Sequence, residues 1–141
     1  MAQLPKLPPL RADDPLGREN LSKRRHKKAI RHGRVDFSLV QASEDRDLLS
    51  VDRLDLAPDS EIVEIADRNG RLRGKSFLGW AVVSVQDASN MGRQVLETPT
   101  LDNHYHADIC LNLPAEQSNR VDWIMQHAFD LASSAVYRER P

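Results

Sequence analysis

An amphipathic stripe near the C-terminus is the strongest constraint on the fold. Apolar residues recur at steps of three and four between residues 121 and 136, and polar residues lie off this stripe. This period is typical of an α-helix with one buried face. Pro114 and Glu116 suit a first helical turn, so the helix is predicted to begin within 114–118. A single helix cannot bury its own stripe, so a second layer is needed.

Short runs of alternating or β-branched apolar residues predict a sheet as that second layer. The runs lie at 35–40, 49–54, 77–85, 94–97 and 104–113. Over 58–75 the choice between helix and hairpin stays open; a helix ending at Gly70 is favoured because Pro58 suits a first turn. We therefore predict an α+β fold, with a small antiparallel or mixed sheet covered by the C-terminal amphipathic helix.

The N-terminal segment differs in composition from the rest of the chain. Residues 1–16 contain four of the eight prolines and no periodic apolar pattern, which predicts an extended Pro-rich arm. This arm is either an unanchored terminus or a docking segment for a partner subunit. The predicted organisation is the arm over 1–16, a basic helix or arm over 17–34, and a single α+β domain over 35–141.

Composition narrows the class of protein. A chain of 141 residues fits one domain, and the net charge of −1 argues against a wholly basic nucleic-acid coat protein. No apolar run reaches the roughly 18 residues of a membrane span, and no secretory leader pattern opens the chain. Cys110 is the single cysteine, which excludes an intramolecular disulfide framework. The expectation is a soluble cytoplasmic protein without membrane contact.

Charge is nevertheless segregated along the chain. Residues 1–34 hold ten Lys or Arg against three acids, whereas 35–68 hold ten acids against three Arg. The densest basic run, 22–34, predicts a short helix that needs a counter-charge. Its candidate binding residues are Lys23, Arg24, Arg25, Lys27, Lys28, Arg31 and Arg34. Nucleic-acid phosphates, an acidic protein partner or the acidic 35–68 segment can supply that charge, and a solvated face needs no partner.

A second candidate site lies in the alternating segment 104–113. In a strand His104, His106 and Asp108 share the face opposite the core. Two imidazoles and a carboxylate suit Zn or Mn, whose bound water is a nucleophile. Without a metal, the same groups suit general acid–base attack on a phosphodiester. A solvated strand face explains the pattern equally well. His127 is either a third imidazole or a boundary residue of the C-terminal helix.

Two functions follow from these patterns. The favoured one is a binding or accessory module that docks through its basic segment on nucleic acid or on an acidic protein partner. The alternative is a metal-assisted hydrolase or nuclease, with His104, His106 and Asp108 as metal ligands and catalytic groups. The alternative ranks second because it needs a further ligand that the sequence does not identify.

Overall fold

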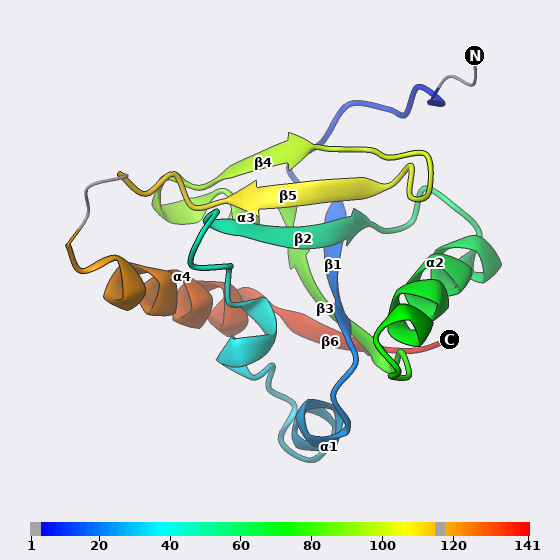
Figure 1. The fold of residues 1–141 in the computed structure, drawn as a ribbon, viewed down its shortest axis with the longest axis horizontal. Coiled ribbons are helices and arrows are strands. Elements are labelled where there is room, and N and C mark those ends of the chain that lie inside the picture. The colour runs from blue at the N-terminus through cyan, green and yellow to red at the C-terminus, as the bar shows by residue number, and fades with distance from the viewer. Residues whose placement is uncertain (1–3, 115–117) are drawn as a thin grey trace.

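A computed structural model describes residues 4–114 and 118–141, and it has the predicted α+β fold (Figure 1). Within these residues, six strands form one antiparallel sheet in the order β4-β5-β2-β1-β3-β6. The strands are β1 (Pro15–Asn20), β2 (Leu48–Arg53), β3 (Gly79–Ser84), β4 (Gln94–Glu97), β5 (His106–Cys110) and β6 (Val136–Glu139). The helices are α1 (Lys23–His32), α2 (Asp59–Leu72), α3 (Val85–Ala88) and α4 (Arg120–Ser134), with 3₁₀ segments η1 (Phe37–Val40) and η2 (Asn90–Gly92).

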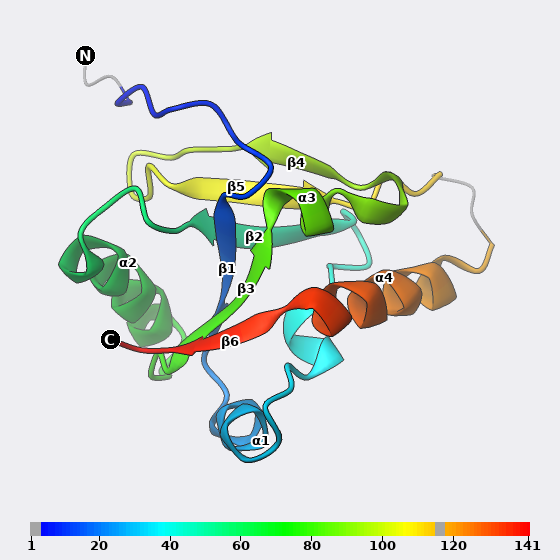
Figure 2. The ribbon, with the colours of Figure 1, turned by 180° about the vertical axis from the view of Figure 1, so that it is seen from behind.

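The sheet consists of two three-stranded halves that meet along a short junction. Strands β1 and β3 pair over six residues and β2 and β5 over five. By contrast, β1 and β2 pair only at Leu16↔Arg53 and Gly17↔Asp52. In Figures 1 and 2 the strands β4, β5 and β2 run across the direction of β1 and β3. Beyond Gly17 the two central strands therefore separate.

Strand β1 places part of the basic N-terminal segment inside the sheet. It lies between β2 and β3, and its Leu16 side chain is completely buried. The predicted division after residue 16 falls inside this strand, and the division after residue 34 falls beyond its end. The strand belongs to the same sheet as the strands of 35–141. Residues 4–14 contain no helix or strand, and residues 1–3 of the predicted arm lie outside the described residues. Docking of the arm on a partner stays a prediction.

Two apolar clusters pack around this sheet. The larger one joins Leu16, Val83 and Ile109 with two side chains of α4, Ile124 and Leu131. These two α4 residues belong to the stripe predicted from sequence. The second cluster joins the aromatic residues Phe77, Trp80 and Tyr105 with Ile62, Ile65 and Ala66 of α2. Helix α4 begins at Arg120, and the predicted onset at 114–118 falls partly on residues outside the described ones.

The prediction of a strand over 35–40 was wrong, because local hydrogen bonds form a 3₁₀ turn there. The Asp36 carboxylate accepts from the Ser38 amide at 2.9 Å and from the Ser38 hydroxyl at 2.5 Å. Such short-range side-chain bonds compete with strand pairing. The apolar residues of the run are still buried, since Leu39 and Val40 belong to the larger cluster.

Over 58–75 the helix is confirmed and the hairpin is wrong. Helix α2 continues past Gly70 to Leu72, and the left-handed residue is Gly74, with φ of 65°. Gly70 is instead buried inside the helix, where the returning chain leaves no room for a side chain. Among the described residues no helix is both long and apolar enough to cross a lipid bilayer.

Candidate functional site

A pocket of about 350 Å³ opens where β1 and β2 separate. Its walls come from these two strands, the start of α1, η1, the end of α2 and the segment before β5. Four cationic side chains line it: Arg18, Arg25, Arg73 and Lys75. Two carboxyl groups, Glu19 and Asp52, line it as well. The divergence of β1 and β2 therefore creates a polar cavity between them.

Among the described residues, the cations of the pocket form no ion pair with its acids. Arg18 donates from Nη1 to the Ser50 carbonyl at 3.1 Å, and burial lowers the pKa of its guanidinium. Arg25 donates from Nε to the Ser38 hydroxyl at 2.9 Å. Within residues 4–114 and 118–141, none of the four forms an ion pair with a carboxylate. This arrangement favours an anionic ligand, because guanidinium groups bind phosphate and carboxylate oxygens in pairs.

The two carboxyl groups of the pocket each accept from an asparagine side chain. Glu19 accepts from the Asn69 amide at 3.1 and 3.2 Å, and Asp52 accepts from the Asn103 amide at 2.8 Å. Burial, followed by the neighbouring Glu19, raises the pKa of Asp52 well above its usual range. The Oδ2 atom of Asp52 is buried and has no hydrogen-bond partner among the described residues. That position suits a protonated carboxyl group.

Helix α1 is held on the body by specific contacts. The Ser22 hydroxyl caps its first turn, and Gly33 ends it with φ of 62°. The His26 ring lies 2.7 Å from the Tyr137 hydroxyl on β6, and Lys28 pairs with Asp36 at 2.8 Å. The basic helix predicted over this segment is thus present.

Five of the predicted binding residues stay solvent-exposed and form no ion pair within the described part of the chain. They are Lys23, Arg24, Lys27, Arg31 and Arg34. Of the other two, Lys28 pairs with Asp36 and Arg25 lines the pocket. The acidic segment 35–68 therefore supplies the helix with a single carboxylate. Arg25 and the capping residue Ser22 connect the exposed basic surface of α1 to the pocket.

The structure brings together two of the three residues of the second candidate site. Both His106 and Asp108 contact the Thr98 hydroxyl, at 2.8 and 3.0 Å. His104 was wrongly placed on the strand, because β5 begins at His106 and His104 lies in the preceding turn. That turn forms because the Asn103 side chain accepts from the Tyr105 amide. Among the described residues, no group of three or more His, Cys, Asp or Glu is arranged to hold a metal ion.

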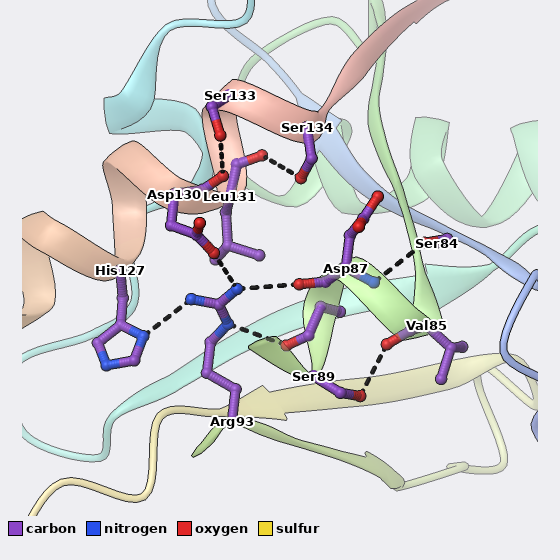
Figure 3. A network of polar contacts seen from close by, with 11 residues as sticks. Ser84, Val85, Asp87, Ser89, Arg93, His127, Asp130, Leu131, Ser133 and Ser134 are labelled. Atoms are coloured by element: carbon purple, nitrogen blue, oxygen red, sulfur yellow. Dashed lines mark hydrogen bonds and ion pairs between the residues drawn. The ribbon is translucent and has the colours of Figure 1, made fainter. Parts of the chain in front are cut away.

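His127 belongs to a buried network away from the pocket (Figure 3). The Arg93 guanidinium donates to His127 Nδ1 at 2.9 Å, to Asp130 at 2.5 Å, and to the carbonyls of Asp87 and Ala88. Burial, followed by the Arg93 charge, lowers the pKa of His127. These bonds join α4 to α3 and the start of β4, so the imidazole has a structural partner.

Sequence reasoning missed most of the pocket. Arg18 and Glu19 lay in a segment interpreted as a basic helix or arm, and Arg73 and Lys75 lay beyond the predicted end of a helix. Asp52 occupies an ordinary polar position of an alternating segment, and Asn103 directly precedes another. One signal in the sequence was available. The charged pair Arg18-Glu19 directly follows Leu16-Gly17, and an apolar residue followed by glycine also suits a buried strand.

Comparison of the chain with family models, with curated proteins and with solved structures found no match.

Proposed function

We propose that this protein binds the phosphate backbone of a nucleic acid on a surface that runs from α1 into the central pocket. The observation that carries the proposal is the set of cations that form no ion pair with a carboxylate of residues 4–114 and 118–141. On α1 these are Lys23, Arg24, Lys27 and Arg31, and in the pocket Arg18, Arg25, Arg73 and Lys75. Grouped cations that stay unpaired are the electrostatic footprint of a phosphate-binding surface.

The composition of this surface favours phosphate over an acidic protein. Protein interfaces have an apolar or aromatic centre, whereas α1 exposes one large apolar side chain, Ile30, and contains no Phe, Tyr or Trp. The lack of these three residue types in α1 also argues against stacking on bases. We therefore expect contacts to the backbone with little reading of sequence.

The test is fluorescence anisotropy with a labelled 2′-O-methyl RNA oligonucleotide over a range of salt concentrations. The triple variant Lys23→Gln, Arg24→Gln, Lys27→Gln is expected to lose at least tenfold in affinity. Its log–log salt slope should fall by about 0.7 for each lost phosphate contact. A control variant of equal charge change is Arg11→Gln, Arg46→Gln, Arg138→Gln, which alters exposed cations elsewhere.

Equal losses in the two triple variants, or a binding curve that does not respond to salt, would contradict the proposal. Binding to poly-glutamate without binding to the oligonucleotide would assign the surface to an acidic protein partner instead.

A further inference from the structure

Two groups able to transfer protons border the cationic pocket. Glu19 reaches it from β1 and His106 from β5. Asp52 lies between them, because it pairs with Gly17 on β1 and with His106 on β5. Residues paired directly across antiparallel strands point to the same face. Glu19, Asp52 and His106 therefore face the same cavity as Arg73 and Lys75.

Glu19 is oriented as a base. Both of its carboxylate oxygens accept from the Asn69 side chain, which fixes the carboxylate on the wall of the pocket. Burial, followed by the neighbouring Glu19, favours the protonated form of Asp52. A carboxylate that is held in a fixed orientation and lies beside cations can remove a proton from a bound hydroxyl.

His106 is oriented as the complementary acid. Its Nδ1 lies 2.8 Å from the Thr98 hydroxyl and 3.1 Å from the Thr98 carbonyl. Since a carbonyl only accepts, Nδ1 carries a hydrogen, and Nε2 is the nitrogen that can exchange a proton with a ligand. The Asp108 carboxylate accepts from the same Thr98 hydroxyl.

We propose that the pocket cleaves single-stranded RNA by transesterification, with Glu19 as general base and His106 as general acid. This inference rests on the proposed binding of a nucleic-acid backbone. Glu19 takes the proton of a ribose 2′-hydroxyl, and the 2′-oxygen forms a bond to the adjacent phosphorus. The bond from phosphorus to the 5′-oxygen breaks, and His106, which must carry hydrogens on both Nδ1 and Nε2 in this step, gives its Nε2 proton to that oxygen. The products are a 2′,3′-cyclic phosphate and a 5′-hydroxyl, and no other reactant is consumed.

The cations of the pocket suit the charge that develops in this reaction. The phosphodiester gains negative charge on its non-bridging oxygens as the 2′-oxygen attacks. Arg25, Arg73 and Lys75 have no carboxylate partner within the described chain and are placed to hold those oxygens. Preorganised positive charge of this kind stabilises the transition state more than the ground state.

The experiment compares cleavage of a fluorescent single-stranded RNA with cleavage of its 2′-deoxy and 2′-O-methyl analogues, in buffer containing EDTA. Only the RNA is expected to be cut, and mass spectrometry should find 2′,3′-cyclic phosphate ends. Glu19→Gln and His106→Gln should each lower the cleavage rate at least 100-fold while anisotropy of the 2′-O-methyl RNA changes less than threefold. The matched controls are Glu44→Gln and His104→Gln, neither of which lines the pocket.

Each other outcome overturns the inference in a distinct way. Binding of the 2′-O-methyl RNA without any cleavage removes the catalytic assignment and leaves the proposed function standing. Loss of both binding and cleavage in the parent protein removes both proposals. Cleavage of the 2′-deoxy analogue, inhibition by EDTA, or unchanged cleavage in Glu19→Gln protein excludes the assigned chemistry.

Discussion

At Asp52, burial and the neighbouring Glu19 carboxylate favour the protonated side chain. A folded-state pKa above the ordinary value of 3.8 means that the folded protein binds more protons than the unfolded one. The free energy of unfolding should therefore fall as the pH rises above that value. Asp52→Asn keeps the shape of the protonated group and can still accept from Asn103. We expect this variant to be about 1–2 kcal/mol more stable than the parent at pH 8 and equal to it near pH 4.

Thermal unfolding followed by circular dichroism from pH 4 to 8 measures this difference. The exposed Asp45→Asn is the control, and it should follow the parent at every pH. A constant difference between Asp52→Asn and the parent across the range would show that the Asp52 proton does not contribute.

The contribution of His127 to the pH dependence of stability has the opposite sign. His127 is buried and accepts from Arg93, so its pKa lies below the ordinary value of 6.5. The unfolded chain then binds more protons, and stability present above pH 6.5 is lost as the pH falls. His127→Gln should reduce the loss of stability between pH 7 and 5, whereas the exposed His32→Gln should not. Urea denaturation at several pH values checks this, and parallel curves for parent and His127→Gln would contradict it.

At the scale of elements, the end of α2 is shaped by Gly70. A Cβ atom built there would lie 2.7 Å from the Lys75 carbonyl oxygen, and the Gly70 carbonyl accepts from the Lys75 amide. Gly70→Ala should therefore push the 73–75 segment away and cost about 1–3 kcal/mol. Affinity for the 2′-O-methyl RNA should fall as well, because Lys75 lines the pocket. Urea denaturation measures the cost, with Ser60→Ala on the exposed first turn as control; equal stability of the two variants would contradict it.

The sequence predicts those elements whose pattern depends on burial alone. Helix α4 and four of the six strands in the described residues follow from their apolar patterns. Helix α1 is predicted from the basic run, and α2 from Pro58 and Gly70 near its ends. The 35–40 run fails because Asp36 and Ser38 bond to each other, and β1 is missed because a central strand carries Arg18 and Glu19 toward a pocket. Arg25 and His106 are the only predicted site residues that line this pocket, since it is assembled by segments far apart in the chain.

For the whole molecule, the N-terminal segment sets where the chain tolerates truncation. Arg53 donates to the Pro8 carbonyl, and Leu7 packs against the second apolar cluster. Removal of residues 1–6 should leave the melting temperature nearly unchanged, whereas removal of 1–20 deletes β1 and should abolish cooperative unfolding. Calorimetry of the two truncated chains checks this prediction. A cooperative transition in the shorter chain would mean that β2 and β3 fold without the strand between them.

The two-residue junction between β1 and β2 has a consequence for motion. Because so few residues pair there, thermal bending of the sheet costs the least free energy at this junction. The amide protons of the junction should exchange with solvent sooner than those of the β2–β5 ladder. A ligand that touches both α1 and the end of α2 spans the same junction. Ligand binding and the stiffness of the sheet are then coupled. A ligand that fills the cavity restrains bending at the junction, and a change that makes the junction more flexible lowers the affinity for that ligand.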